Sequence, residues 1–394
     1  MKGPSFNGNQ FIQTALDAGA AYAVSDDNTL GANKRIILVP DVLQSLQNLA
    51  KYHRAQFDIP FIAITGSNGK TTTKELLHEV LSSTYKTYTT AGNFNNHIGI
   101  PLTLLKIRPG AEKAVIEMGA NHLNEIASYC QFVKPTHGLI TNCGKAHLEG
   151  FGSMEGVRKG KGELFDYLRM HNGTAFVMWD YDYLRAMSKG ITQVITYGTR
   201  YADITGESSQ YRHLLEVNIT SGAKKYTIHT QLAGEYNFPN VLAAVAIGKH
   251  FGIADEKIKN AIENYLPSNS RSQLIHKNSN TIILDAYNAN PTSMKAAIEN
   301  FAGMEGADKV LLLGGMMELG EESIAEHQFI ADLIHQYKWK AVALVGGDFY
   351  KIKHPYYYFE TALLAKKWLQ DQNFTDTLLL IKGSRSMQME RVLD

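Results

Sequence analysis

Short apolar runs alternate with amphipathic stretches along most of the chain, and this alternation predicts strands and helices in turn. After residue 60 it predicts strands over residues 61–65, 114–117, 138–141 and 174–177, and helices over residues 72–81, 123–129 and 154–168. The alternation resumes after residue 270, with strands over residues 281–285, 310–313, 341–345 and 378–381, and helices over residues 293–301, 324–336 and 363–369. Because such alternation is typical of β–α units on a largely parallel sheet, we predict an α/β protein.

Two changes in this pattern divide the chain. Short β-like stretches with turn residues over 193–232 predict a small antiparallel annex, followed by a helix over 238–249. The stretch Pro267-Ser-Asn-Ser270 is typical of a linker. We therefore expect three domains: residues 1–58, with short helical and strand-like pieces such as 11–17 and 35–39; residues 59–269; and residues 270–394, a doubly wound, Rossmann-like domain.

The composition is that of an ordinary globular protein and excludes several classes. Among 394 residues, 39 Lys and Arg against 38 Asp and Glu give a net charge of +1, which argues against a dedicated nucleic-acid binder. Two cysteines, Cys130 and Cys143, cannot form a disulfide framework or a four-ligand zinc site. No apolar run approaches the ~18 residues of a membrane span, and the first residues lack the apolar core of a signal peptide. We therefore expect a cytoplasmic protein without membrane insertion.

A glycine-containing loop between the strand at 61–65 and the helix at 72–81 carries the sharpest chemical signal. It reads Ile64-Thr-Gly-Ser-Asn-Gly-Lys-Thr-Thr-Thr73. Gly66 and Gly69 allow backbone amides to turn toward phosphate oxygens. Lys70 can place a positive charge at the β- and γ-phosphates, and Thr71 can give a hydroxyl ligand to Mg²⁺. The alternative is a tight strand–helix connection with an incidental lysine, and the combination of both glycines with Gly-Lys-Thr speaks against it.

The spacing of this loop narrows the choice of family. Only two residues separate Gly66 from Gly69, where the general phosphate loop has four. The shorter loop resembles the ATP loop of the Mur ligase superfamily, which includes the folylpolyglutamate synthases. Further stretches follow in the family's order and extend the resemblance over nearly the whole chain: residues 92–101, 117–121, 144–152, 285–291, 313–320 and 382–386.

Two of these stretches resemble one type of Mur ligase, the type that joins D-alanyl-D-alanine to UDP-N-acetylmuramoyl-tripeptide. They are Asp285-Ala-Tyr-Asn-Ala-Asn-Pro291 and Met317-Glu-Leu-Gly320. The resemblance implies an ATP-dependent ligase of peptidoglycan synthesis that works through an acyl phosphate. It also implies a three-domain architecture, with a partial N-terminal UDP-substrate domain, a central P-loop ATPase domain and a C-terminal ligase domain. The expected partners are these two small substrates, with no nucleic acid, and we expect a monomer.

The resemblance also assigns the ATP-binding and metal-binding residues. The loop would bind ATP through Thr65, Gly66, Ser67, Asn68, Gly69, Lys70, Thr71 and Thr72. Two Mg²⁺ ions would be held by Thr71, Glu117, His147 and a carbamate on Lys161, and the catalytic set would be Lys70, Glu117, His147 and Lys161. From the residues alone, Glu117 ends a predicted strand beside the loop, where a carboxylate can hold Mg²⁺. Without the family, Lys161 would be interpreted as a solvated charge on a helix and His147 as a loop or core histidine.

The remaining assignments concern nucleotide and substrate contacts. By resemblance, further ATP contacts come from Asn237, Arg271, Asp285, Tyr287 and Asn288, and substrate contacts come from Asn93, Asn95, Asn96, Lys382, Ser384 and Arg385. Each group also has a plainer interpretation. Asn240 fits a helix cap, the asparagine loop at 93–96 fits Asx turns, and the residues at 382–385 fit a surface charge cluster.

The chain departs from the family in three places. Ala286 and Gly315 stand where this type usually has aspartates, so we expect the surrounding loops to differ. The family's opening uridine-binding segment has no counterpart here, and the chain starts some thirty residues late. We therefore expect normal ATP binding and a weak hold on the UDP end of the substrate.

Three alternative functions stay open on the sequence. A folylpolyglutamate synthase shares the loop, although residues 285–291 and 317–320 speak against it. A motor, switch or kinase that hydrolyses ATP without ligation is disfavoured by the short loop. An ATP-binding remnant without ligation is suggested by the missing opening segment.

Overall fold

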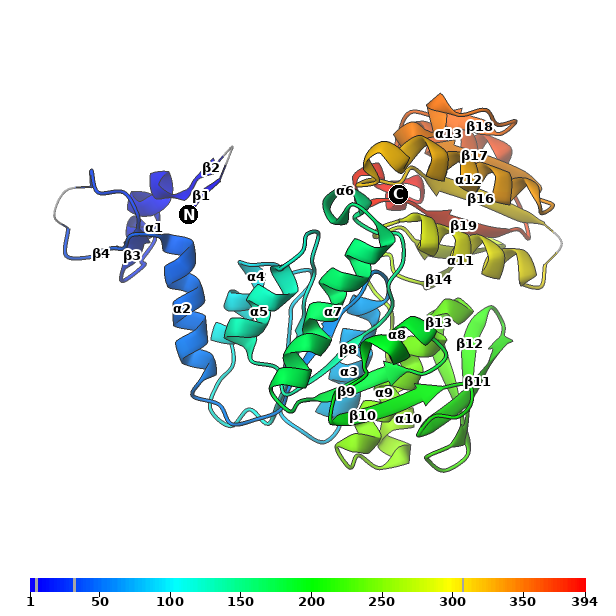
Figure 1. The fold of residues 1–394 in the computed structure, drawn as a ribbon. Helices are drawn as coiled ribbons and strands as arrows, with labels where there is room; N and C mark the ends of the chain where they lie inside the picture. Colours follow the sequence, from blue (N-terminus) through cyan, green and yellow to red (C-terminus); the bar gives the residue numbers. More distant parts are fainter. Residues whose placement is uncertain (4–5, 31–32, 307) are drawn as a thin grey trace.

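The computed structural model describes residues 1–3, 6–30, 33–306 and 308–394. Figure 1 shows a small N-terminal part, a central part built on a large sheet, and a C-terminal part built on a second sheet. Extensive parallel pairing in both large sheets, with helices between the strands, confirms the predicted α/β class.

The central sheet is continuous and mostly parallel. Its strand order is β13 (Tyr226–Ala233), β12 (Leu214–Ser221), β11 (Ile204–Tyr211), β10 (Gln193–Gly198), β9 (Thr174–Met178), β8 (His137–Ile140), β5 (Phe61–Thr65), β7 (Lys113–Glu117) and β6 (Thr87–Thr89). Every residue of β5, β7 and β9 is buried. Strands of a parallel sheet that is covered on both faces are apolar throughout, which is why their positions could be predicted from sequence.

Helices cover both faces of this sheet. They are α3 (Lys70–Ser82), α4 (Gly99–Leu105), α5 (Glu125–Val133), α6 (Leu148–Phe151), α7 (Met154–Met170), α8 (Asp182–Met187), α9 (Phe238–His250) and α10 (Asp255–Asn264). Helix α3 packs against α9 and α10, and α5 packs against α7. The residues that these helices and strands bury form one hydrophobic core, which supports the loops at the carboxyl ends of the parallel strands.

The predicted antiparallel annex is present but differs in its extent. Strands β11, β12 and β13 pair antiparallel and continue the edge of the central sheet. Strand β10 pairs parallel with both β9 and β11, so the prediction that the annex starts at residue 193 is wrong. The physical reason is α8, because a crossover containing a helix returns the chain in the parallel direction.

The C-terminal part is a second α/β unit. Its sheet has the order β14 (Gln273–Lys277), β15 (Asn280–Asp285), β19 (Leu378–Lys382), β16 (Lys309–Gly314), β17 (Ala341–Val345) and β18 (Tyr357–Phe359). Only the edge pair β14–β15 is antiparallel among the described strands of this sheet. Separate apolar clusters cover the two faces, with helices α11 (Pro291–Gly303), α12 (Ser323–His335) and α13 (Ala362–Gln372). This arrangement confirms the predicted doubly wound unit.

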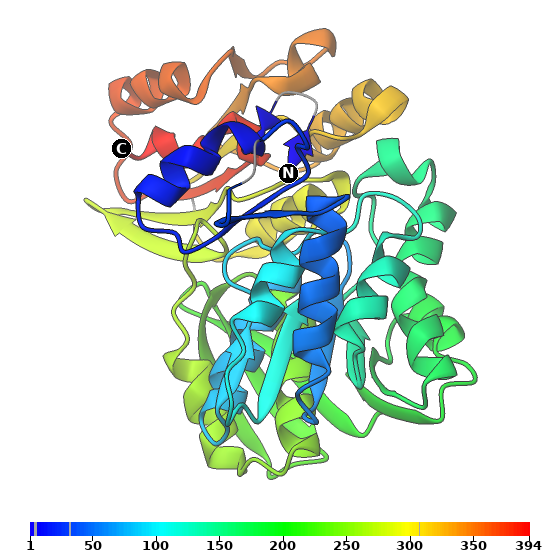
Figure 2. The ribbon, with the colours of Figure 1, turned by 90° about the vertical axis from the view of Figure 1, so that its left-hand side faces the viewer.

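The N-terminal part is attached through one helix. It contains β1 (Lys2–Gly3), β2 (Phe6–Asn7), α1 (Ile12–Asp17), β3 (Ala23–Ser25), β4 (Ile36–Leu38) and α2 (Val42–Arg54). Helix α2 packs on α4 and α5, and it stands upright along the central part in Figure 2. Arg54 fixes its end, because the guanidinium donates to the carbonyls of Val133 and Lys134 and lies 3.5 Å from the centre of the Phe61 ring.

Across the described residues, no helix combines the length and the apolar character needed to cross a membrane. Both cysteines are buried and unpaired.

A histidine pair at the start of β8 predicts a pH-dependent stability. Nε2 of His137 lies 3.1 Å from Nε2 of His250, and burial, with the His250 and Lys113 charges, lowers the pKa of His137 from 6.5 to about 4. Between these two pH values the unfolded chain binds the proton more readily than the folded chain, so the free energy of unfolding falls as the pH falls through this range. We expect His137→Phe to make the free energy of unfolding less dependent on pH between 7 and 5.

Urea denaturation at several pH values measures this slope. The exposed His335 on α12 provides a matched control, and His335→Phe should leave the slope unchanged. An unchanged slope in the His137 variant would contradict the prediction.

Candidate active site

The predicted phosphate loop connects β5 to α3 at the carboxyl edge of the central sheet. Gly66 and Gly69 adopt φ angles of 143° and 80°. A Cβ on Gly66 would lie 2.0 Å from Oγ1 of Thr141, and a Cβ on Gly69 would lie 2.6 Å from Oδ1 of Asn240. Both the backbone conformation and the space therefore require glycine, and α3 begins at Lys70 with its positive end at the loop.

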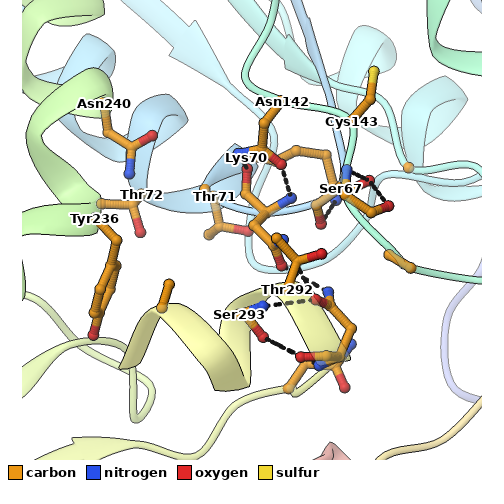
Figure 3. A pocket seen from close by; sticks show the side chains of 18 of the residues that line it. Ser67, Lys70, Thr71, Thr72, Asn142, Cys143, Tyr236, Asn240, Thr292 and Ser293 are labelled. Atoms are coloured by element: carbon orange, nitrogen blue, oxygen red, sulfur yellow. Dashed lines mark hydrogen bonds between the residues drawn. The ribbon is translucent and has the colours of Figure 1, made fainter. Parts of the chain in front are cut away.

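Lys70 holds its ammonium group against the loop itself. Its Nζ donates to the carbonyl oxygens of Gly66 at 2.7 Å and Ser67 at 3.2 Å. Burial lowers the pKa of Lys70, and the nearby Glu117 opposes this effect. A lysine held at this position can meet a phosphate with little reorganisation. Figure 3 shows Lys70 together with Ser67, Thr71 and Thr72 in the cavity.

Glu117 ends β7 next to the loop. Its Oε1 accepts hydrogen bonds from Oγ1 of Thr71 at 3.2 Å and from Nδ2 of Asn95 at 2.7 Å. Its Oε2 is buried and has no hydrogen-bond partner among the described residues. A buried carboxylate oxygen without a donor is costly unless a cation is present, so Glu117 and Thr71 fit a bound Mg²⁺.

The other two predicted metal ligands have different partners in this structure. Nδ1 of His147 lies 2.5 Å from Oε2 of Glu318, and this contact lowers the pKa of Glu318. Nζ of Lys161 is buried and donates to the carbonyl of Ala120 at 2.8 Å. No three His, Cys, Asp or Glu side chains gather as a metal site in the described parts of the chain. A two-metal site would therefore need the Thr71 hydroxyl and a modified Lys161.

Lys161 has an unusual environment for a lysine on α7. Burial is the main cause that lowers its pKa to about 7, and the charge of Lys70 lowers it further. Its ammonium also lies 4.9 Å from the centre of the Phe151 ring. The interpretation of Lys161 as a solvated surface charge is therefore wrong, because the side chain faces the interior.

One cavity of about 870 Å³ joins the central and C-terminal parts. Most of the predicted nucleotide residues line it: Ser67, Asn68, Gly69, Lys70, Thr71, Thr72, Asn237, Arg271, Asp285, Tyr287 and Asn288. Of the predicted metal and substrate residues, those that line it are Glu117, His147, Asn93, Asn95, Asn96 and Lys382. Five predicted residues are not part of its wall in the described structure: Thr65, Gly66, Lys161, Ser384 and Arg385.

Two asparagines at the start of α9 hold the wall of this cavity. Asn237 is buried and donates to the carbonyl of Ala233 and to Oγ of Ser272, both at 3.0 Å. Asn240 donates to Oδ1 of Asn237 and accepts from Oγ1 of Thr73. The interpretation of Asn240 as the helix cap is wrong, because α9 already begins at Phe238 and the side chain bonds to α3.

The three predicted substrate residues at the end of β19 and just after it make different contacts. Lys382 is buried and donates to Oδ2 of Asp285 at 2.6 Å, so the two side chains form a pair. Ser384 is also buried, and its hydroxyl links the carbonyl of Ala289 to the amide of Met317. The third residue, Arg385, places its guanidinium over an aromatic ring, 5.2 Å from the centre of the Tyr287 ring.

The asparagine loop has both a local and a cavity-facing part. Oδ1 of Asn96 accepts from the amides of Ile98 and Gly99, which confirms the Asx-turn interpretation for this residue. Asn95 instead reaches Glu117, and Asn93 faces the cavity.

Several cavity residues were missed by the sequence analysis. Asn142, which follows β8, fixes Asn68 through its Oδ1 and its Nδ2. Tyr236 lies within 3.5 Å of Asp285, and burial raises its pKa well above the ordinary value. The signal for Asn142 was its position just after a parallel strand, where ligand-binding residues gather. Two further cavity residues that escaped prediction are Thr292 and Glu318.

Gly315 and Ala286, which stand where this type of ligase usually has aspartates, are both closely packed. A Cβ on Gly315 would lie 2.5 Å from Cα of Gly347, so no side chain fits there with the present backbone. Ala286 is fully buried. An aspartate at either position would require a rearranged loop.

The fold and the geometry of the site together indicate a general class of protein. A phosphate loop on a parallel sheet faces a second α/β unit across one cavity, and a buried carboxylate stands beside the loop; this is a phosphate-loop nucleotide-binding protein. Residues 64–248 match the Mur ligase middle domain, and residues 270–385 match the Mur ligase glutamate ligase domain.

Similar proteins place the chain more narrowly. The chain is 35% identical over its full length to the UDP-N-acetylmuramoyl-tripeptide–D-alanyl-D-alanine ligase of Bacillus subtilis, and the comparison covers 88% of that protein. The crystal structure of MurF from Acinetobacter baumannii superposes with a TM-score of 0.90 at 30% identity, covering 100% of this chain and 88% of that one. MurF from Thermotoga maritima in complex with ADP gives a TM-score of 0.90 at 26% identity, covering 100% and 92%. The chain belongs to the Mur ligase family, in its UDP-N-acetylmuramoyl-tripeptide–D-alanyl-D-alanine ligase branch.

Proposed function

We propose that this protein is an ATP-dependent ligase that joins D-alanyl-D-alanine to UDP-N-acetylmuramoyl-tripeptide. The product would be the UDP-linked pentapeptide used for peptidoglycan, and we propose that the reaction takes place in the cytoplasm. The observation that carries the proposal is a phosphate loop, with Lys70 and Glu117, in one cavity with Arg271 and Asp285 of the C-terminal part. The full-length similarity to a ligase with this substrate name supports the choice of substrates.

The proposed chemistry has two steps. A carboxylate oxygen of the tripeptide attacks the γ-phosphorus of ATP, the bond to the β-phosphate oxygen breaks, and an acyl phosphate and ADP form. The amine of D-alanyl-D-alanine then attacks the acyl carbon, loses a proton, and inorganic phosphate leaves. Phosphorylation is needed because a free carboxylate has no adequate leaving group. The residues of this chain position the reactants and stabilise the charge that develops on the phosphoryl oxygens.

Individual residues take parts in this scheme. Lys70 and the amides at the start of α3 would hold the β- and γ-phosphates. Arg271, whose guanidinium lies 3.5 Å from the Tyr287 ring centre, would reach the phosphates from the C-terminal part. Asn237, Asp285, Tyr287 and Asn288 would contact the nucleoside.

We propose that Thr71 and Glu117 hold Mg²⁺, since Oε2 of Glu117 lacks a donor. When bound, such an ion neutralises charge on the phosphate oxygens. His147 and a carbamylated Lys161 would complete a second site with Glu117. His147 would then exchange its contact with Glu318 for the metal.

The environment of Lys161 supports the carbamate. A pKa of about 7 leaves a large share of the side chain as the neutral amine at neutral pH. The amine nitrogen adds to the carbon of CO₂ and loses a proton, which gives a carbamate anion. This change replaces a buried cation by an oxygen ligand, as a metal site beside Glu117 requires.

We also propose the boundaries of the three domains at residues 58/59 and 269/270. The first lies between α2, which ends at Arg54, and β5, which begins at Phe61. The second lies between α10 and β14, where Asn269 and Ser270 adopt φ angles of 56° and 55°. The change from the central core to the two C-terminal clusters occurs over the same region.

The test is a phosphate-release assay with the full chain. We expect no sustained release with ATP alone or with ATP and UDP-N-acetylmuramoyl-tripeptide, and steady release once D-alanyl-D-alanine is added. The reason is that the acyl phosphate is consumed only by the incoming amine. Release at the same rate with ATP alone would overturn ligation and favour a hydrolysing switch or motor. Glutamate and a folate in place of the two substrates test the folylpolyglutamate alternative.

A further inference from the structure

Asn68 stands at the middle of the phosphate loop and its side chain leaves the loop. Its backbone is fixed from the loop after β8, since its amide donates to Oδ1 of Asn142 at 3.0 Å and its carbonyl accepts from Oγ1 of Thr141 at 2.6 Å. The side chain has no part in these bonds. It points to the C-terminal part, where it meets Asn290.

The two side-chain amides bond to each other in both directions. Nδ2 of Asn290 donates to Oδ1 of Asn68 at 2.7 Å, and Nδ2 of Asn68 donates to Oδ1 of Asn290 at 3.4 Å. Asn290 is buried, and it also caps α11, because its Oδ1 accepts from the amide of Ser293 at 2.9 Å. The contact therefore joins the phosphate loop to the first turn of the first helix in the C-terminal part.

A second contact beside this pair also joins the start of α11 to the central part. The amide of Lys145 donates to Oγ1 of Thr292 at 2.9 Å, and a Cβ on Gly144 would lie 2.8 Å from that oxygen. The start of α11 thus approaches the loop after β8 as closely as glycine allows. Figure 3 shows Thr292 and Ser293 opposite Lys70 and Thr71 in the same cavity.

We propose that the Asn68–Asn290 pair is a positioning contact that couples the phosphate loop to the placement of the C-terminal part. When the loop holds nucleotide, the pair sets α11, and with it the strand end that carries Asp285 and Tyr287, at the working distance. Neither asparagine is assigned a chemical step. The inference rests on the proposed function for its activity readout, while its conformational readout does not.

Two substitutions separate this role from helix capping. Asn290→Ser keeps a side-chain oxygen that can cap α11 but is too short to reach Asn68. Asn68→Ala removes the same pair from the other side and leaves α11 untouched. Thr361→Ala is the matched control, because Thr361 caps α13 in the same sheet unit and does not line this cavity in the described structure.

The first measurement is kinetic. We expect each variant to lower kcat about tenfold, and we expect the Kd for ADP to change less than threefold in Asn290→Ser, since the contact orients groups and Asn290 is not among the nucleotide-binding residues. The double variant should be no slower than either single variant, because one pair is lost in all three. Thr361→Ala should keep kcat within twofold. A kcat within twofold of wild type in Asn290→Ser, or single effects that multiply in the double variant, would overturn the proposal.

The second measurement follows the domains directly. Lys189 of the central part and Lys338 of the C-terminal part are exposed, and both native cysteines are buried, so Lys189→Cys and Lys338→Cys allow selective fluorescent labelling. We expect ADP to change the energy transfer between these labels in the otherwise wild-type chain and to change it by less than half as much with Asn290→Ser. An equal ADP response in both chains would overturn the coupling. A wild-type chain that responds to ADP but does not ligate would count against the proposed function and leave the coupling standing.

Discussion

Replacing Lys70 with alanine is expected to lower ATP-dependent ligation by about 10²–10³-fold, as the loss of one charge-stabilising group does in enzymes that transfer acyl or phosphoryl groups. The lysine is already held at the loop by the carbonyls of Gly66 and Ser67, so its positive charge lies close to where the loop would hold the phosphates. The fold should remain, because Lys70 is the first residue of α3, and the contacts of its ammonium group are with the carbonyls of Gly66 and Ser67 and not with the apolar core. The measurements are phosphate release with all three substrates, and thermal unfolding.

An exposed lysine of the same part of the molecule provides the control. Lys86→Ala removes one positive charge near the other end of the sheet and should leave the turnover unchanged. Lys70→Arg keeps the charge but changes its shape, and it should recover only part of the activity. A Lys70→Ala enzyme with more than a tenth of wild-type turnover would refute the assignment of the phosphate loop.

The parts of the fold that sequence predicted are those whose signal is local. Strands β5 and β17 occupy the predicted residues 61–65 and 341–345, because each is a short apolar run in a sheet covered on both faces. The phosphate loop was predictable for a related reason. Its two glycines and its Gly-Lys-Thr sequence encode both the backbone conformation and the chemistry of one short segment.

Elements with little burial escaped prediction. Helix α2 has 13 residues, and Val42, Ala50 and Arg54 are the ones it buries, so it packs on the central part through few side chains. The edge strands β14 and β18 are half-buried or exposed along most of their length. In these elements tertiary contacts, such as those of Arg54, decide the structure.

The candidate site shows the same division between local and distant contacts. Asp285 and Lys382 were each predicted as ligand-binding residues, and the structure shows that they also bind each other at 2.6 Å. Neighbouring strands β15 and β19 bring them together, although the chain separates them by 97 residues. A sequence can name such residues one at a time, but their pairing depends on strand order.

Two side-chain contacts join the central part to the C-terminal part beside the cavity. Lys145 forms an ion pair with Glu326 of α12, and His147 contacts Glu318. Lys145 and His147 both lie on the segment after β8, next to the phosphate loop. The same segment therefore contacts the phosphate loop on one side and the C-terminal part on the other.

Replacing Lys161 with alanine is expected to lower ligation at least about 100-fold, as the loss of a metal ligand or of its immediate support commonly does. The structure gives the reason for choosing this lysine: the side chain is buried, its amine donates to the Ala120 carbonyl and to no other described residue, and its pKa falls to about 7. A cation in that position is poorly stabilised, and the proposed carbamate would replace it by an anion that could bind metal. The matched control is Lys159→Ala on the same helix, because Lys159 is exposed and its loss should leave the activity unchanged.

Chemical rescue distinguishes a carbamate from a structural lysine. Removal of the side chain leaves space next to the metal site, and formate or acetate can place a carboxylate there, so either acid should restore part of the activity of Lys161→Ala and none of that of Lys70→Ala. In parallel, ¹³C NMR of the wild-type enzyme in labelled bicarbonate should show a carbamate signal that is absent from the Lys161 variant and present in Lys159→Ala. A wild-type enzyme without the signal under turnover conditions would show that Lys161 acts unmodified, and full activity of Lys161→Ala would show that ligation does not need this side chain. If the carbamate signal is clear but formate and acetate do not restore activity, the modified side chain must also position neighbouring residues, which a small free acid cannot do.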